Sequence, residues 1–321
     1  MSATAPALEV SHVRKVYRSP HVVANDDISF VVHPGEAFGL LGRNGAGKTT
    51  LVKQIVGLMA PTSGEVRLFG HPVQTARGAS VGSTVAYLPQ GLPSLGDLRV
   101  SEAVAWTGML RGVSKRPAHS EAEELIAQLE LASVADRQLR KLSGGQRRLV
   151  QIAMTLVGSL PVIILDEPTA DIDPSLRKRI WQMLWQRARN GVAMILVTHD
   201  VTEAEQVLDR VAIMDRGNIV AAGAPGELKA RLAHRTRIEV VTAKDGPVDP
   251  RAVAEDLAEG AIVRGRHISA WVPRDEAIRR LEKFMSAVDM DALEDVRLVT
   301  PTLEDVFLEG GRELPVEEDI R

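Results

Sequence analysis

A glycine-rich loop between a short apolar strand and a helix constrains this chain more than any other part of its sequence. Residues 37–41 are apolar and predict a short buried strand, and residues 48–59 have helical periodicity. The loop between them, residues 42–49, reads Gly-Arg-Asn-Gly-Ala-Gly-Lys-Thr and matches the pattern GxxxxGK[ST]. This order of strand, glycine loop and helix predicts a phosphate-binding loop, and therefore a nucleoside triphosphate as the ligand.

The chemistry of this loop assigns roles to its residues. Glycines let successive backbone N–H groups close around phosphate oxygens, and the start of the following helix adds positive partial charge. Lys48 is expected to reach the β- and γ-phosphates, and Thr49 to ligate Mg²⁺. The residues predicted to bind ATP through the loop are Gly42, Arg43, Asn44, Gly45, Ala46, Gly47, Lys48, Thr49 and Thr50.

A second polar site is predicted where an apolar run ends in two acids. Residues 162–168 read Val-Ile-Ile-Leu-Asp-Glu-Pro, which predicts a buried strand whose end enters a polar site. Asp166 is expected to hold Mg²⁺, and Glu167 to position and polarise the attacking water. An acid at a strand end is often only solvated, but the place of Glu167 directly before Pro168 favours the hydrolytic role.

The remaining pattern alternates strands and helices and predicts an α/β fold with a mostly parallel sheet covered by helices. Helices dominate from about residue 98 to residue 156, and strands and helices alternate again from 162 to 222. After residue 234 the pattern restarts. Its order βαββαβ predicts a small α+β appendage that resembles a ferredoxin-like domain.

The segment Leu-Ser-Gly-Gly-Gln at residues 142–146 indicates the class of protein to which the glycine loop belongs. Together, the two segments resemble those of the ATP-binding cassette (ABC) family of transporter ATPases. The resemblance implies a P-loop NTPase core in residues 1–234, with an antiparallel β subdomain and a helical insert at about 95–156, followed by the α+β domain in 235–321. It also implies a dimer in which each chain contacts the ATP of its partner. The residues expected to do so are Ser143, Gly144, Gly145, Gln146 and Asp173.

The same resemblance assigns further residues to the site. Glu167 is expected to be the catalytic carboxylate, Gln90 to contact Mg²⁺ and the attacking water, and His199 to contact the γ-phosphate. Tyr17 is expected to stack on adenine, the alternative being a tyrosine that packs on its strand. Asp171 departs from the family pattern, in which a small residue precedes the interface aspartate.

Bulk properties limit the function. The chain of 321 residues has a net charge of −3, which argues against a nucleic-acid partner, and no cysteine. It shows no signal peptide and no apolar run of about 20 residues, so a separate permease is expected to form the pore. The expected location is the cytoplasmic face of the cell membrane.

An ABC ATPase of this kind has four candidate functions. Residues 300–308, Thr-Pro-Thr-Leu-Glu-Asp-Val-Phe-Leu, resemble the tail of ATPases that serve drug, antibiotic and lipid exporters of the daunorubicin-resistance type. This favours an exporter subunit over an importer subunit, a cytosolic ABC ATPase acting on ribosomes, or a chromosome ATPase with coiled-coil arms. Trp106 is expected either to line the permease docking surface or to pack in the core. The identity of the cargo and of the second ATPase subunit stays open.

Overall fold

The computed structural model describes residues 5–73, 79–91, 95–169, 172–199, 205, 207–244, 254, 257, 258 and 261–309. The chain divides into two compact units, one ending at Gly223 and the other beginning at Ala224. The division into domains 1–234 and 235–321 stays a prediction. Each unit is described below by itself.

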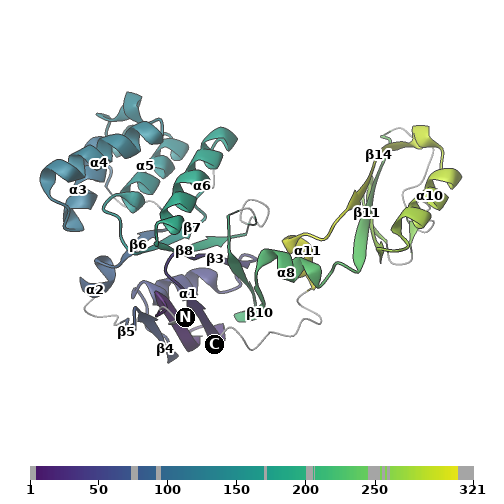
Figure 1. Cartoon of the computed structure of the whole chain (residues 1–321), viewed down its shortest axis with the longest axis horizontal. Helices are drawn as coiled ribbons and strands as arrows, with labels where there is room; N and C mark the ends of the chain where they lie inside the picture. Colours follow the sequence, from purple (N-terminus) through teal and green to yellow (C-terminus); the bar gives the residue numbers. More distant parts are fainter. Residues whose placement is uncertain are drawn as a thin grey trace. The chain divides into compact units, whose positions relative to one another are not determined.

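The first unit contains an antiparallel sheet with the strand order β2-β1-β4-β5, of which β4 and β5 are labelled in Figure 1. Its strands β1, β2 and β4 carry apolar residues that join the main core of the unit, among them Leu8, Phe30 and Val66. The strands are β1 (Leu8–Arg18), β2 (His21–Val32), β4 (Ser63–Leu68) and β5 (His71–Pro72).

The second sheet of this unit is mostly parallel, with the order β10-β9-β3-β8-β7-β6. Every residue of β3, β7 and β8 is buried, as expected for strands covered on both faces. The strand pairs are parallel except for the hairpin of β9 and β10. The strands are β3 (Ala37–Gly42), β6 (Val85–Leu88), β7 (Val162–Asp166), β8 (Ala193–Thr198), β9 (Arg210–Asp215) and β10 (Asn218–Gly223). The predicted α/β fold with its antiparallel β part is thus confirmed.

Helices connect these strands and form the insert before β7. They are α1 (Lys48–Ile55), α2 (Ala79–Gly82), α3 (Val100–Leu110), α4 (Lys115–Gln128), η1 (Ala132–Val134), η2 (Leu139–Lys141), α5 (Gly144–Leu156) and α6 (Pro174–Arg189). The prediction of a helix to residue 59 was too long, because α1 ends at Ile55 and Gly57 follows with a φ of 72°. No helix among the described residues has the length and apolar character needed to cross a bilayer.

The second unit is built on a four-stranded antiparallel sheet with the order β12-β13-β11-β14. Burial alternates along β11, so one face of the sheet packs on a core that includes Ile238, Val240 and Phe284. Ala254 and Leu257, which lie between β11 and β12 in the chain, belong to the same core. The elements are α8 (Pro225–Ala230), β11 (Arg235–Thr242), β12 (Ile262–Arg264), β13 (His267–Pro273), α10 (Ala277–Ala287), η3 (Met290–Ala292), β14 (Leu293–Val299) and α11 (Leu303–Glu309).

Candidate active site

Four predicted site segments follow the carboxyl ends of neighbouring strands. The glycine loop follows β3, His199 follows β8, Asp166 ends β7, and Gln90 comes two residues after β6. Because β3, β8, β7 and β6 are adjacent and parallel, their carboxyl ends meet at one edge of the sheet. The topology therefore collects these residues into one site.

The glycine loop is shaped by two glycines that no other residue could replace without a shift. Gly42 has a φ of 154°, and a Cβ there would lie 2.4 Å from the carbonyl oxygen of Met214. Gly47 begins α1 with a φ of 103°, and a Cβ there would lie 2.1 Å from the carbonyl oxygen of Ala24. The loop is thus packed directly against the backbone of β9 and β2, which fixes its path.

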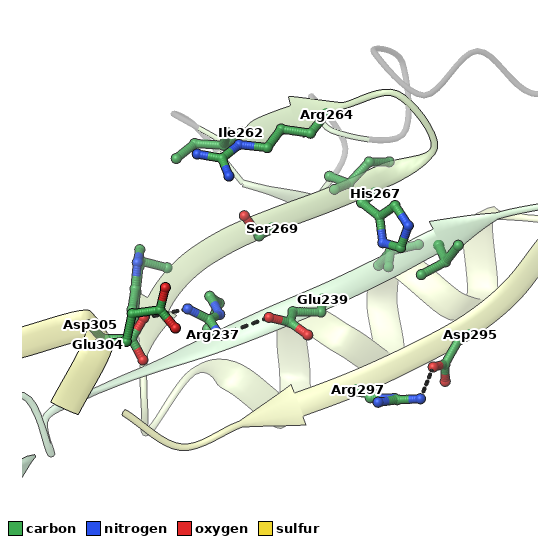
Figure 2. A pocket seen from close by; sticks show the side chains of 14 residues that line it. Arg237, Glu239, Ile262, Arg264, His267, Ser269, Asp295, Arg297, Glu304 and Asp305 are labelled. Carbon is green, nitrogen blue, oxygen red and sulfur yellow. Dashed lines mark hydrogen bonds and ion pairs between the residues drawn. The ribbon is translucent and has the colours of Figure 1, made fainter. Parts of the chain in front are cut away.

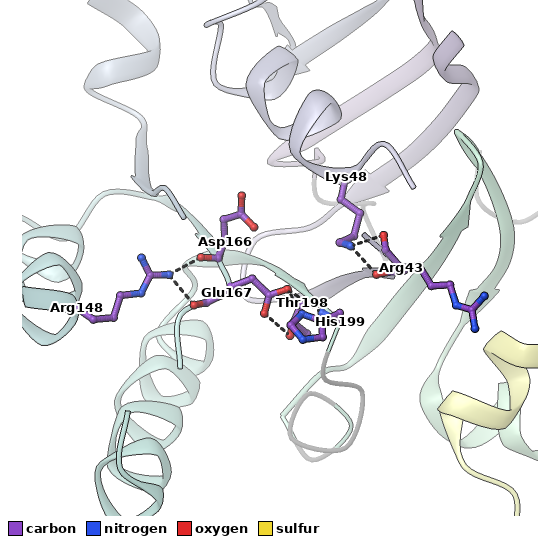
Figure 3. A network of polar contacts seen from close by, with 8 residues as sticks. Arg43, Lys48, Arg148, Asp166, Glu167, Thr198 and His199 are labelled. Atoms are coloured by element: carbon purple, nitrogen blue, oxygen red, sulfur yellow. Dashed lines mark hydrogen bonds and ion pairs between the residues drawn. The ribbon is translucent and has the colours of Figure 1, made fainter. Parts of the chain in front are cut away.

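The ammonium group of Lys48 lies inside this loop. Its Nζ donates to the carbonyl oxygens of Gly42 at 2.5 Å and of Arg43 at 3.0 Å. Burial lowers the pKa of Lys48, and the charges of Glu167 and Asp166 oppose that effect. The carbonyl of Arg43 faces the lysine while its side chain extends away from it (Figure 3).

Asp166 is a buried carboxylate without a full set of donors. It is 2% exposed, and no donor among the described residues reaches its Oδ2. Burial raises the pKa of Asp166, the neighbouring Glu167 raises it further, and Lys48 partly offsets both. An ionised carboxylate in this position is suited to a cation.

The surroundings of Asp166 fit Mg²⁺ in particular. Mg²⁺ is usually bound by one or two protein oxygens together with phosphate oxygens and water, rather than by a cage of carboxylates. In the described part of the chain, no three His, Cys, Asp or Glu side chains cluster as a metal site. Thr49 and Gln90, the other predicted ligands, are both exposed at the same edge of the sheet. A single buried carboxylate with an unpaired oxygen beside a phosphate loop matches this requirement.

Glu167 is held by the end of the neighbouring strand β8. Its φ is 51°, an uncommon value for a glutamate, and its backbone N–H donates to Val197 at 2.8 Å. Its Oε2 accepts a hydrogen bond from the hydroxyl of Thr198 at 3.1 Å. Its Oε1 accepts from the backbone N–H of His199 at 2.9 Å and lies 2.6 Å from the ring Nδ1 (Figure 3). Because an ionised carboxylate only accepts, the Nδ1 atom of His199 carries a hydrogen in this pair.

The segment around Ser143 forms the start of α5. The Ser143 hydroxyl accepts from the backbone N–H of Gln146 at 3.2 Å, and the Gln146 side chain accepts from the backbone N–H of Ser143 at 3.1 Å. This reciprocal capping box leaves the N–H groups of Gly144 and Gly145 in the first turn of an α-helix of 13 residues. The predicted anion-binding feature therefore lies at a true helix start.

Asp173 also caps a helix. Its Oδ1 accepts from the backbone N–H of Ser175 at 2.9 Å and from the Ser175 hydroxyl at 2.7 Å, at the start of α6. These hydrogen bonds lower the pKa of the Asp173 carboxyl. Asp171, which was singled out as a departure from the family pattern, lies outside the described residues.

Tyr17 lies on β1 beside the first turn of α1. Its hydroxyl is 3.4 Å from the Thr50 hydroxyl, and it donates to the sulfur of Met59 at 3.4 Å. The aromatic ring is thus near the glycine loop, as an adenine-stacking role requires, while it also packs on its own subdomain.

Arg148 was missed by the sequence reasoning, although it links the segments of the site. It is 8% exposed and donates to the carbonyl oxygens of Pro89 at 2.7 Å, Asp166 at 2.5 Å and Glu167 at 2.6 Å. It therefore ties α5 to the residue before Gln90 and to the end of β7; Figure 3 shows the contacts with Asp166 and Glu167. The available signal was a cation on the apolar face of the helix, one turn before Ile152.

Comparisons with known proteins agree with this geometry. Residues 25–170 match the sequence family described as ABC transporter. The chain is 35% identical to the doxorubicin resistance ATP-binding protein DrrA of Mycobacterium tuberculosis, over 94% of this chain and 92% of that protein. It is 34% identical to the Nod factor export ATP-binding protein I of Paraburkholderia xenovorans, over 96% of this chain and 98% of that protein.

Solved structures show the same fold. A structure of an ATP binding subunit of an ABC transporter superposes with a TM-score of 0.66 at 26% identity, over 70% of this chain and 93% of the other. A dimeric ATP-binding cassette bound to ADP and Pi in a post-hydrolysis state has a TM-score of 0.63 at 24% identity, over 68% of this chain and 98% of the other.

Proposed function

The chain belongs to the ABC transporter ATPase family, and we propose that it is the ATP-hydrolysing subunit of an exporter that works with a separate permease. The observation that carries this proposal is the extent of the similarity. Two relatives whose names state drug resistance and export align over more than nine-tenths of this chain, so the match includes the second unit as well as the cassette. The importer and cytosolic alternatives have no comparable support.

The proposed hydrolysis uses the groups at the carboxyl edge of the sheet. The loop from Gly42 to Thr50 would hold the phosphates, with Lys48 exchanging its two carbonyl partners for β- and γ-phosphate oxygens. Mg²⁺, held by Thr49, Gln90 and Asp166, would neutralise charge that develops on the phosphates. These assignments rest on the geometry of the loop and on the unpaired Oδ2 of Asp166.

Glu167 and His199 would act together on the attacking water and the γ-phosphate. With Nδ1 donating to Glu167, a protonated His199 ring can donate its Nε2 hydrogen to a γ-phosphate oxygen. Thr198 holds the other carboxylate oxygen, so the orientation of Glu167 is set before a water arrives. Glu167 would then polarise that water for in-line attack.

We further propose that two cassettes close on ATP. The start of α5, with Ser143, Gly144, Gly145 and Gln146, would receive the γ-phosphate bound to the partner chain, and Asp173 would face the same interface. Such a γ-phosphate binds both chains, so its cleavage would remove contacts that favour the closed dimer. Whether the second cassette is a copy of this chain or a different one is left to experiment.

The permease is proposed to dock on the helical insert. Two large apolar side chains of α3 are exposed there, Trp106 at 45% and Leu110 at 89%, so the core alternative for Trp106 is wrong. The two side chains are four residues apart on α3 and so lie on one face of the helix, where together they can form an apolar patch that a partner protein covers. This surface would place the protein at the cytoplasmic face of the membrane, and the cargo would be a drug, antibiotic or lipid-like molecule.

The experiment that tests the proposal is tagged purification from detergent-solubilised native membranes, followed by mass spectrometry. We expect a stoichiometric polytopic membrane protein to accompany the wild type, and Trp106→Glu to lose it while keeping ATP hydrolysis. Ribosomal or DNA-associated partners without a membrane protein would contradict the exporter assignment.

A second measurement tests the ATP-driven closure of the two cassettes. We expect Glu167→Gln to form a stable ATP-dependent dimer by size-exclusion chromatography with light scattering, because ATP binds but is not cleaved. A profile that is the same with and without ATP would contradict ATP-driven closure.

A further inference from the structure

The outer edge of β14 is a long strand edge with no partner among the described residues. β14 is the last strand in the order β12-β13-β11-β14, and it pairs only with β11 there. Edge strands are usually guarded by shortness, proline, charged side chains, a bulge or a cover, since their N–H and C=O groups can pair with another chain. β12, at the opposite edge, is three residues long, whereas β14 has seven residues, contains no proline and has one register shift near its start, between Asp295 and Leu293.

The side chains of β14 are largely accessible. The side chain of Arg297 is 69% exposed, that of Glu294 57%, and Leu298 is 44% exposed. Asp295 and Arg297 project from the face that lines a cavity of about 440 Å³, where they form an ion pair at 2.6 Å (Figure 2). Val296 and Leu298 pair with Val240 and Ile238 of β11, so they lie on the face that carries the core.

We propose that β14 is a self-association surface, on which β14 of a second copy of this chain pairs antiparallel and joins the two sheets into one. The sequence Leu-Glu-Asp-Val-Arg-Leu-Val selects a single register for such a pair. With Val296 opposite its own copy, Asp295 lies opposite the partner's Arg297, and Arg297 opposite the partner's Asp295. The regular pairing ends at Asp295, because the register with β11 shifts between Asp295 and Leu293.

Neighbouring registers are disfavoured by charge. A two-fold axis at Asp295 would oppose two aspartates, one at Arg297 would oppose two arginines, and one at Glu294 would oppose two glutamates. Like charges directly opposite in a sheet are destabilising, and opposite charges are stabilising. A net charge of −3 adds little repulsion between copies. Charge complementarity therefore points to a second copy as the occupant.

The absence of cysteine from the chain permits a clean test, because any introduced cysteine is unique. Directly opposite residues of antiparallel strands have Cα atoms about 4.5–5.5 Å apart, which is within the range of a disulfide. We expect Val296→Cys to form a covalent dimer on mild oxidation in EDTA without nucleotide. The matched control is Glu294→Cys, whose copy would lie about 14 Å away, four residues along the strand, and should not cross-link.

Charge exchange gives an independent readout that needs no covalent bond. In sedimentation without nucleotide, we expect Asp295→Arg and Arg297→Asp each to raise the dimer dissociation constant at least tenfold, and the double variant to restore it. Equal cross-linking of both cysteine variants, no cross-link at all, or a double variant no better than the singles would overturn the proposal. Melting temperatures confirm that each variant is folded. Since ATP is left out, these results do not depend on the proposed ATP-driven closure of the cassettes.

Discussion

Two buried aspartates, one in each unit, show how differently the molecule handles a buried charge. Asp166 is 2% exposed and Asp305 is 1% exposed. The carboxylate of Asp305 accepts from the backbone N–H and the hydroxyl of Thr302, at 2.8 and 2.7 Å, and forms an ion pair with Arg237. Asp166 leaves its Oδ2 without a donor among the described residues.

This difference in hydrogen-bond partners distinguishes a structural residue from a candidate ligand-binding residue. Burying an ionised carboxylate is costly unless hydrogen bonds or an opposite charge compensate for it. Asp305 is compensated inside its own unit, at the start of α11. Asp166 is compensated in part by Lys48, which makes it the candidate ligand for a cation. Burial does not distinguish the two residues, whereas the count of hydrogen-bond partners does.

The largest effect should come from Asp166→Asn, which tests whether Asp166 is the functional member of the two buried aspartates. We expect kcat for ATP to fall by about 10³-fold, because the cation that neutralises the phosphates loses its carboxylate ligand. The melting temperature should stay the same or rise, because an incompletely compensated charge is removed. Steady-state hydrolysis and thermal unfolding measure both. A variant with near wild-type kcat would show that Asp166 is not a ligand.

Asp305→Ala tests whether Asp305 is the structural member of the pair. The substitution removes the ion pair with Arg237 and both hydrogen bonds from Thr302, and it leaves Arg237 with Glu239 as its remaining ion-pair partner. We expect the free energy of unfolding to fall by about 3 kcal/mol. ATP hydrolysis per folded cassette should be retained. Urea unfolding checks the stability, and Asp295→Ala, at an exposed ion pair, is the matched control with an expected loss below about 1 kcal/mol. Equal losses in the two variants would contradict the assignment.

Arg148→Lys tests a residue between these two cases, because Arg148 is buried and also contacts residues of the candidate active site. A lysine keeps the charge but cannot donate in a fork to Pro89, Asp166 and Glu167. We expect kcat to fall about tenfold with little change in KM, because Glu167 moves while the glycine loop does not. The control is Arg111→Lys, which loses buried contacts to the other end of α5 and should lower stability more than kcat. A parallel rise in KM for the Arg148 variant would show that the loop is disturbed as well.

The smallest effect concerns pH. The pKa of Asp166 lies above its ordinary value of 3.8 in the folded protein, so the folded state binds this proton more tightly than the unfolded chain. The stability that the protonated group contributes is present at low pH and is lost as pH rises above 3.8 through the folded pKa. In EDTA without nucleotide, the melting temperature of Asp166→Asn should therefore gain on the wild type as pH rises from 4 to 7. A difference that is constant with pH would rule out this raised pKa.

The sequence was sufficient for those parts of the fold and site that local pattern determines. The continuous apolar runs at β3, β7 and β8 predicted the parallel sheet, because strands covered on both faces must be apolar throughout. The strand, loop and helix order predicted where the glycine loop lies. The roles given to its residues, and to Glu167, Gln90 and Ser143, stay predictions until they are measured.

Other features depend on contacts between distant segments and could not be predicted. The fork of Arg148 joins residues 59 and 18 positions away along the chain, at Pro89 and Asp166, so no local pattern reveals it. The satisfied state of Asp305 depends on Arg237, which is 68 positions away. Helix ends were also misplaced where a single glycine, such as Gly57, ends a periodic run early.

The capping box at Ser143 has a consequence for selectivity. The Ser143 hydroxyl oxygen accepts from the backbone N–H of Gln146, and the N–H groups of Gly144 and Gly145 belong to the same first helical turn. A group that meets this helix start therefore encounters backbone N–H donors and the positive end of the helix. In the proposed closed dimer, this helix start would therefore favour phosphate oxygens over cationic groups.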